Sequence, residues 1–433
     1  MIVLVFAGLI LLAHFYLWHR MVRSTTGPGR LRKALTWGVV GLAVLVVATF
    51  AGTRMELGHW LAWPGYVWLA LMFYLLVFLA VLEVPRAVAA FFVRRAERRA
   101  APAEPEPVSA MAGGPALAEQ EPVPTVAGGT ALPEPGLSEP VLPEPPLPEP
   151  APETPPMSRR LFIGRATAAV AGVGALGTVG YGMTSALGDP VIERVKVALP
   201  KLDARLSGLR FAVVSDIHLG PLTGRGHTER IVRMINGLEA DVVAIVGDLV
   251  DGSVAQLGAL AQPLKSLESR YGAYFVTGNH EYFAPSGPME WIEELGQLGV
   301  RSLRNERVEI KHQGAVLDLA GVNDLNGESS GDGPDFDKAL GGRDTGRSTV
   351  LLAHQPLQVE QAARHGVDLQ LSGHTHGGQI VPFNLVVGLQ QPVVSGLATV
   401  DGVQVYVTRG AGFWGPPVRV GAPPEITMLE LST

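Results

Sequence analysis

The chain has 433 residues, a formal net charge of −6 at pH 7, and no cysteine. The absence of cysteine excludes disulfide bonds, thiolate zinc sites, iron–sulfur clusters and cysteine nucleophiles. The negative charge argues against a nucleic-acid-binding protein, because such a protein needs a basic face.

The first hundred residues are predicted to form a transmembrane region with three helices. The mean hydropathy of the chain, +0.24, is high for a soluble protein. Three apolar runs approach or reach the ~20 residues that cross a bilayer: Met1–Trp18, Ala34–Gly52 and Trp60–Leu82. A cleaved signal peptide is the alternative for the first run. No basic residue precedes its apolar stretch, so we expect a retained helix.

Basic residues predict the orientation of these helices. The loop between the first two runs carries four arginines and one lysine, whereas the next loop carries only Arg54. Five arginines follow the third run, between residues 86 and 99. Because basic loops stay in the cytoplasm, we expect the first loop and residues 86–100 there and the N-terminus outside.

Residues 101–157 are predicted to be a disordered linker rich in proline and glutamate. They contain seventeen of the 34 prolines, nine glutamates and no lysine or arginine. Such a segment buries too little apolar surface to offset its ordering entropy. A role in Pro-rich recognition is an alternative, but we favour a spacer.

Residues 158–189 are predicted to form a fourth membrane helix or a signal anchor. Arg159 and Arg160 precede a Gly/Ala-rich run that reaches about Gly182. This pattern resembles a twin-arginine export signal, and an ordinary basic flank of a membrane helix explains it equally well. Gly172–Gly177 match the dinucleotide pattern GxGxxG, but no strand precedes them, so we reject that interpretation. Small residues here favour close helix packing. Both alternatives place the following domain outside the cytoplasm.

Residues 190–433 are predicted to form an α/β domain with antiparallel additions. Alternating or continuous apolar runs predict buried strands at Leu209–Ser215, Asp241–Gly247, Ala273–Thr277, Ala315–Gly321, Thr349–Ala353 and Asp368–Ser372. Helical spacing is found at Thr228–Leu238 and Pro288–Leu298. Hairpin turns are expected at Gln313-Gly314 and Asp401-Gly402.

Polar motifs follow five of the predicted strands. They are Asp216-x-His218, Gly247-Asp248-x-x-Asp251, Gly278-Asn279-His280-Glu281, His354, and Gly373-His374-x-His376. In α/β folds, ligands bind beyond the carboxyl ends of strands, so five such ends predict one site. A single motif of this kind is usually a turn or a core histidine, but the whole set is hard to explain that way. The other histidines of the domain, His227, His312 and His365, are interpreted as surface residues.

The ordered series resembles the motif blocks of the calcineurin-like metallophosphoesterase superfamily, from Leu209 to about His376. Residues 377–383 and 406–410 further resemble a bacterial membrane-anchored branch, some members of which use the twin-arginine route. The resemblance implies a four-layer αββα sandwich that holds two divalent metal ions. It implies that Asp216, His218 and His376 bind one metal and that Asn279, His354 and His374 bind the second. Asp248 would bridge both metals, and His280 would be a catalytic histidine that binds no metal.

Residue chemistry agrees with these implied roles. Imidazole and oxygen ligands suit Mn, Fe or Zn. Purple acid phosphatases of this superfamily have Tyr at the position of Asp251. Because that Tyr is absent here, we expect a redox-inert pair of metal ions, with Mn preferred and Zn or Fe as alternatives. We expect Asp251 to orient a ligand or His280. A water that bridges two metals is expected to be largely hydroxide near neutral pH and to act as the nucleophile.

The predicted function is that of a multi-pass cell-membrane phosphoesterase with an extracytoplasmic catalytic domain. We expect it to cleave phosphodiester or pyrophosphate bonds of a lipid-linked or envelope substrate, with no nucleic-acid partner. The alternatives are a phosphomonoesterase, a metal-dependent nuclease, a soluble cytoplasmic phosphatase and a non-catalytic metal-binding membrane sensor. Residues that bind the substrate are not identified. Arg225, Arg409 and a platform of Phe413 and Trp414 are candidates, each with a structural alternative.

Overall fold

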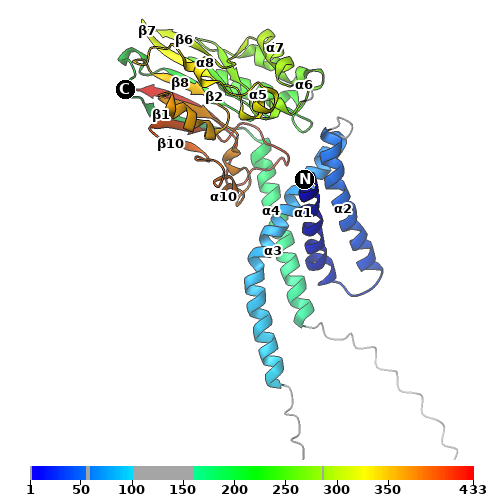
Figure 1. The fold of residues 1–433 in the computed structure, drawn as a ribbon. Helices are drawn as coiled ribbons and strands as arrows, with labels where there is room; N and C mark the ends of the chain where they lie inside the picture. The colour runs from blue at the N-terminus through cyan, green and yellow to red at the C-terminus, as the bar shows by residue number, and fades with distance from the viewer. Residues whose placement is uncertain (1, 55–58, 101–158, 285–286) are drawn as a thin grey trace, which may run out of the picture. The chain divides into compact units, whose positions relative to one another are not determined.

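The structure is a computed structural model that describes residues 2–54, 59–100, 159–284 and 287–433 (Figure 1). The predicted linker, residues 101–157, lies outside the described residues. The chain divides into two compact units, of which one comprises Met1–Val84 and Gly164–Thr433 and the other Pro85–Ile163. Every contact discussed below joins residues of the first unit.

Long apolar helices precede the α/β domain. They are α1 (Ile2–Leu17), α2 (Arg30–Arg54), α3 (His59–Ala100) and α4 (Arg159–Leu187). Among the described residues, three stretches are long and apolar enough to cross a membrane: Arg30–Thr53, Trp60–Ala89 and Arg159–Leu187. They coincide with the second, third and fourth predicted runs. Helix α1 has 16 residues, fewer than the ~20 that span a bilayer without distortion.

Small residues let α4 pack closely, as the sequence predicted. Ala171, Ala175, Val179 and Gly182 are buried along one side of the helix. A Cβ atom on Gly174 would lie 3.0 Å from the ring of Phe78 in α3. Of the glycines in the GxGxxG pattern, Gly174 therefore allows α3 to approach closely, whereas a Cβ atom on Gly177 would meet no atom within 4 Å.

Gly182 provides a test of how α4 contacts the α/β domain. A Cβ atom there would lie 2.5 Å from Cγ1 of Val418, whereas one on Gly180 would meet no atom within 4 Å. We expect Gly182→Leu to lower the free energy of unfolding by about 1–3 kcal/mol through overpacking. Gly180→Leu is the matched control. Thermal unfolding of the full chain in detergent measures both, and equal Tm values for the two variants would contradict this contact.

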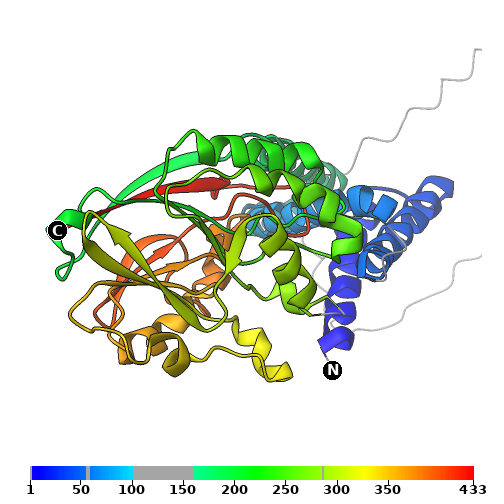
Figure 2. The ribbon, with the colours of Figure 1, turned by 90° about the horizontal axis from the view of Figure 1, so that it is seen from above.

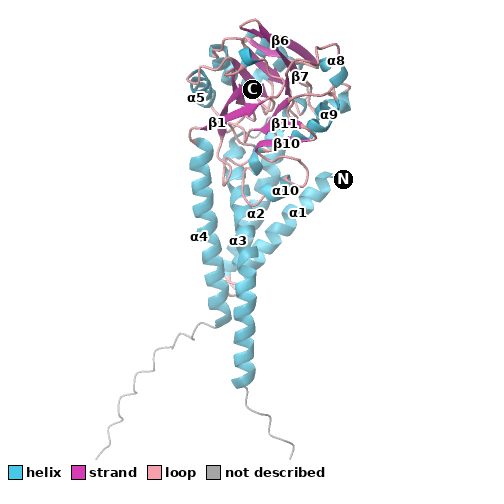
Figure 3. Ribbon diagram, turned by 90° about the vertical axis from the view of Figure 1, so that its left-hand side faces the viewer, coloured by secondary structure: helices cyan, strands magenta, loops and turns pink. Residues whose placement is uncertain are grey.

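Two mixed sheets form the α/β domain (Figure 3). The strands are β1 (Val191–Ala198), β2 (Arg210–Val214), β3 (Val242–Val246), β4 (Ala273–Val276), β5 (Val300–Ser302), β6 (Glu306–His312), β7 (Ala315–Gly321), β8 (Thr349–Leu352), β9 (Leu369–Ser372), β10 (Gly396–Val400), β11 (Val403–Val407) and β12 (Glu425–Ser432). One sheet has the order β1-β12-β2-β3-β4-β5, and the other β10-β11-β9-β8-β7-β6. Neighbours β2, β3, β4 and β5 are parallel, as are β7, β8, β9 and β11.

Helices cover the outer face of each sheet, so the predicted four-layer αββα sandwich is confirmed (Figure 2). The domain's α-helices are α5 (Arg225–Asn236), α6 (Val254–Ala261), α7 (Met289–Gln297), α8 (Phe336–Leu340), α9 (Val359–Arg364) and α10 (Asn384–Val387). Apolar side chains of α5–α7 pack on one sheet, and those of α8 and α9 on the other. Between the sheets, alternate residues such as Phe211 and Leu319 form the central core.

Local sequence patterns predicted many of these strands, helices and turns. The six predicted strands match β2, β3, β4, β7, β8 and β9, and both predicted helices match α5 and α7. The predicted hairpin turns are confirmed, because Gln313-Gly314 and Asp401-Gly402 join antiparallel pairs with positive φ at each residue. The sequence did not reveal β1 and β12, which pair in parallel although they lie at opposite ends of the domain. Pairing of that kind leaves no local signal.

Candidate metal centre

The predicted site residues lie at the carboxyl ends of parallel strands in both sheets. Asp216 follows β2, Asp248 follows β3, and Asn279 follows β4. His354 follows β8 and His374 follows β9 in the second sheet. Because carboxyl ends of parallel strands meet at one edge, the sandwich gathers these side chains from positions distant in the sequence.

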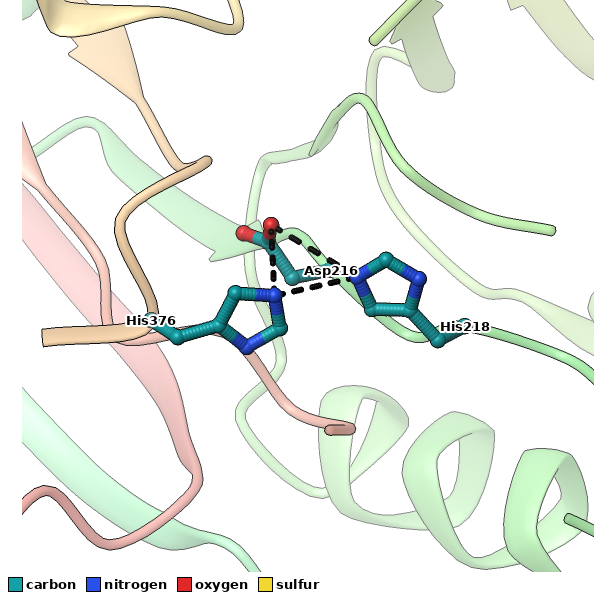
Figure 4. A group of neighbouring side chains, drawn as sticks. All are labelled: Asp216, His218 and His376. Atoms are coloured by element: carbon teal, nitrogen blue, oxygen red, sulfur yellow. Dashed lines mark hydrogen bonds and ion pairs between the residues drawn. The ribbon is translucent and has the colours of Figure 1, made fainter. Parts of the chain in front are cut away.

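One group of converging atoms comes from Asp216, His218 and His376 (Figure 4). The Nε2 atoms of His218 and His376 are 3.0 Å apart. The Oδ1 atom of Asp216 lies 3.4 Å from Nε2 of His376 and 3.9 Å from Nε2 of His218. All three side chains are buried, so three donor atoms face one small volume.

A second group comes from Asp248, His354 and His374, with Asn279 beside them. The Oδ2 atom of Asp248 lies 3.2 Å from Nε2 of His354. The Oδ1 atom of Asn279 lies 3.2 Å from that same Nε2 atom and 2.8 Å from Nδ1 of His374. The four residues implied by the resemblance for the second metal and the bridge are therefore neighbours.

Asp248 lies between the two groups. Its Oδ2 atom is 3.2 Å from Nε2 of His354 in one group and 3.9 Å from Nε2 of His218 in the other. Its Oδ1 atom accepts a hydrogen bond from the backbone N–H of His280 at 2.9 Å. The carboxylate is thus held in place while it faces both groups.

Asp251 joins the two histidines nearest to it. Its Oδ1 atom lies 2.8 Å from Nδ1 of His218 and 2.7 Å from Nδ1 of His280. The Nε2 atom of His280 then points toward Asp248, at 4.0 Å from Oδ2. Burial lowers the pKa of His280, but Asp248 and Asp251 outweigh burial and raise it to about 9. The two carboxylates therefore favour the protonated form of the ring.

The backbone is strained at most of the predicted ligands. Positive φ angles of 48–71° occur at Asp216, His218, Asp248, His374 and His376. Non-glycine residues rarely adopt this conformation, and such outliers cluster at functional sites. Glycine provides the space around them, since a Cβ atom on Gly278 would collide with the carboxylate of Asp248.

Burial and neighbouring charges shift the pKa values of the site's side chains in different directions. Burial, with His354 acting in the same direction, lowers the pKa of His374 to about 3. Burial and Arg419 hold the pKa of His376 well below its usual range. Burial raises the pKa of Asp248, but the charge of His354 outweighs it and holds the pKa well below its usual value. Burial lowers the pKa of His354, but Asp248 and Asp216 outweigh it and hold that pKa well above its usual value. Neutral imidazole and ionised carboxylate are the forms that bind metals, so His354 has to release its proton to bind one. The set of imidazole and carboxylate donors suits a divalent transition metal.

Glu281 has a structural position that the sequence did not reveal. Its side chain is fully buried, and its carboxylate accepts hydrogen bonds from backbone N–H groups on both sides of the site. The donors are Gly278 at 2.6 Å, Leu249 at 2.8 Å, Asp248 at 3.1 Å and Val250 at 3.3 Å. Burial, together with Asp248, raises the pKa of Glu281 to about 7. This carboxylate ties the loop after β3 to the loop after β4.

Arg419 is a second residue that the sequence did not reveal. It is fully buried and donates through Nη1 to the carbonyl of His376 at 2.8 Å. Its Nε donates to the carbonyl of Gly412 at 3.0 Å. Its backbone N–H donates to the carbonyl of Gly182 in α4 at 2.9 Å. Arg419 therefore connects α4 with the loop that carries His376.

The structure corrects predictions for residues outside the two donor groups. His227 and His312 are buried, so their interpretation as surface residues is wrong, because helical and strand faces that pack inward accept these rings. Arg409 is paired with Glu193 and Glu425, each at 2.5 Å.

The remaining candidates for substrate binding lie in different environments. Arg225 is exposed and paired with Glu229 at 2.8 Å. Phe413 is buried, whereas Trp414 is half-exposed with its ring centroid 6.1 Å from that of His280. Of these aromatic residues, only Trp414 is therefore free to offer a surface beside the site.

The buried His227 predicts a pH dependence of stability. Burial, followed by Arg230, lowers its pKa from 6.5 to about 4. Between these values the unfolded chain holds more protons than the folded one, so stability falls as the pH falls through this window. The loss contributed by His227 amounts to about 3 kcal/mol. We expect His227→Gln to reduce the acid dependence of unfolding by that amount, measured by urea unfolding across the window. An unchanged dependence of the free energy of unfolding on pH would contradict this role of His227.

Comparison with known proteins identifies phosphoesterase relatives of this domain. A family model described as calcineurin-like phosphoesterase matches residues 209–378. A transmembrane protein with metallophosphoesterase domain from Danio rerio is 41% identical over 260 residues, which cover 58% of this chain and 59% of that protein. An uncharacterised metallophosphoesterase of Helicobacter pylori is 40% identical over 262 residues, 59% of this chain and 68% of that protein.

A further relative is shorter than these two. An uncharacterised metallophosphoesterase of Aquifex aeolicus is 32% identical over 244 residues, which cover 55% of this chain and 91% of that protein. The chain therefore belongs to the calcineurin-like phosphoesterase family. The match spans 59% of the length of the vertebrate relatives from Danio rerio and Bos taurus.

Proposed function

We propose that the chain is a membrane-anchored phosphoesterase with two divalent metal ions, which hydrolyses phosphodiester or pyrophosphate bonds. The observation that carries this proposal is the carboxylate of Asp248, which faces two separate groups of buried donor atoms. A carboxylate shared by two cations reduces their mutual repulsion.

The proposed ligands divide into two sets around Asp248. Asp216, His218 and His376 hold one metal, and Asn279, His354 and His374 hold the other. Bound metals would neutralise phosphoryl oxygens and activate a water molecule for attack. Manganese is the proposed metal, with zinc and iron as alternatives, because imidazole and oxygen ligands suit all three.

His280 is proposed to act on the leaving group. Its Nδ1 atom bonds to Asp251, which leaves Nε2 to donate a proton to the leaving oxygen or a hydrogen bond to a phosphoryl oxygen. Asp251 orients both His280 and His218 through one oxygen atom. In this proposal Asp251 positions the proton donor His280, and neither residue binds a metal.

The substrate is proposed to be lipid-linked or part of the cell envelope. This proposal rests on the membrane helices and on the basic flanks that predict an extracytoplasmic domain, residues 190–433. A tag at Thr433 tests the topology. The tag should be accessible to a membrane-impermeant reagent in intact cells. A tag that the reagent reaches only after lysis would overturn the proposed extracytoplasmic location of the domain.

Metal content and turnover test the activity itself. The full chain is purified in detergent without chelator, and its metals are quantified. Bis(p-nitrophenyl) phosphate and p-nitrophenyl phosphate are then assayed with added Mn. We expect about two metals per chain and diester turnover that a chelator abolishes. Preference for the monoester would make the protein a phosphomonoesterase. Bound metal without turnover of either compound would favour a metal-binding sensor.

A further inference from the structure

The segment Val381–Leu389, called here the apolar loop, exposes large apolar side chains. It includes the short helix α10 and follows directly on the site residues His374 and His376. Its exposed fractions are Val381 42%, Phe383 44%, Leu385 69%, Val386 50% and Leu389 85%. No charged residue occurs between His376 and Asp401. Several large apolar side chains exposed within nine residues indicate an interaction site for a protein or a membrane.

The apolar loop is connected to the last turns of the long apolar helix α4. The backbone N–H of Val381 donates to the carbonyl of Val420 at 3.0 Å. Val418 and Val420 pack on Gly182 of α4. Gly182 lies only about 7.5 Å along the helix axis from Leu187, where α4 ends, at 1.5 Å per residue. The loop therefore starts beside the last turns of α4.

A second contact joins the α/β domain to the apolar helix α3. A Cβ atom on Gly415 would lie 3.6 Å from Cε1 of Tyr66 in α3. Tyr66 follows the exposed Trp60 and Trp63 at the beginning of the apolar stretch of α3. Tryptophan favours the membrane–water interface. The loop that contains Gly415 therefore lies about at the depth of this interface.

Exposed aromatic side chains connect this level with the site. The ring of Phe283 lies 4.9 Å from the ring of His280, and the ring of Trp414 lies 6.1 Å from it. Both aromatic residues are half-exposed. The proposed proton donor thus has apolar neighbours, one of which precedes Gly415.

We infer that the apolar loop and Trp414 lie in the surface of the bilayer that α3 and α4 cross, and that the site takes its phosphoester from an amphiphile in that bilayer. The inference rests on the proposed function and adds the physical state of the substrate. Apolar side chains without charge gain free energy by burial at the boundary of headgroups and acyl chains. The phosphoester would reach the site while the acyl chains remain in the lipid.

Cysteine labelling measures the position of the loop directly, because the chain has no cysteine. Leu389→Cys in the full chain is labelled with an environment-sensitive fluorophore and reconstituted in phosphatidylcholine–phosphatidylglycerol nanodiscs containing nitroxide lipids. We expect blue-shifted emission and quenching by the nitroxides. The control is Lys311→Cys, because the side chain of Lys311 is 74% exposed. Lys311 belongs to strand β6, which lies at the other end of the domain from α10 (Figure 1). The control should show neither effect.

Two results at Leu389 would overturn the inference. Emission typical of water, equal to that of the Lys311→Cys control, would show that the loop lies outside the bilayer. Blue-shifted emission without nitroxide quenching would show that a protein, such as a second copy of the chain, covers the loop.

Turnover distinguishes this inference from the proposed function. The double variant Leu385→Glu, Leu389→Glu should lower the ratio of lipid-borne to soluble diester turnover by about 10-fold, which corresponds to ~1.4 kcal/mol. An unchanged ratio would contradict delivery from the bilayer, while turnover of the soluble diester by the unaltered chain would still support the phosphoesterase activity. Quenching at Leu389 without any turnover would overturn the activity alone.

Discussion

Asp248→Asn is expected to lower phosphoester hydrolysis by at least ~100-fold and to reduce the bound metal, because residues that merely orient metal ligands already contribute up to that factor. Asp248 faces His354 on one side and His218 on the other. An amide at this position carries no charge and offers a single acceptor oxygen. Elemental analysis and steady-state hydrolysis of bis(p-nitrophenyl) phosphate by the full chain measure both effects.

The control for Asp248→Asn is another buried aspartate. Asp318 in β7 is fully buried and pairs with Arg307 at 2.6 Å, away from the two donor groups. Asp318→Asn should lower stability through loss of this pair while metal content and turnover per folded molecule remain. Full activity of Asp248→Asn with normal metal content would refute the proposed centre.

Glu281→Gln is expected to have the second largest effect. The buried carboxylate accepts from the backbone N–H groups of Gly278, Asp248 and Leu249. Glutamine replaces one acceptor oxygen of the carboxylate with an NH2 group, which is a donor. This NH2 group would face backbone N–H groups, which are donors too and would lose their acceptor. We expect the free energy of unfolding to fall by about 3 kcal/mol, and metal affinity and turnover to fall by about 10–100-fold.

Metal titration separates a positioning role of Glu281 from a purely structural one. If Glu281 positions the loops that carry Asp248 and Asn279, excess metal should restore part of the turnover and raise the Tm of the variant. The control, Glu229→Gln, alters an exposed pair with Arg225 and should change neither quantity. A destabilised variant with unaltered metal affinity and turnover would limit Glu281 to a role in stability.

Much of the fold was predictable because its signals are local. Strands such as β3 are short runs of apolar residues, and Gln313-Gly314 marks a turn by the backbone conformation that glycine permits. The burial of His227 and the ion pairs of Arg409 were not predictable, since each depends on elements that pack from elsewhere in the chain. The long apolar helices were predictable from length and hydropathy, whereas the packing of α4 against Val418 was not.

The sequence by itself determined which polar residues follow the buried strands, and so which side chains gather at one edge of the sandwich. This is possible because strand, turn and polar motif occur within a few neighbouring residues. Only the tertiary structure decided that Glu281 joins two of these loops, that Arg419 connects His376 with α4, and that the apolar loop is bonded to Val420 beside α4. Those relations depend on contacts between distant segments, which packing and hydrogen bonding of the whole domain create.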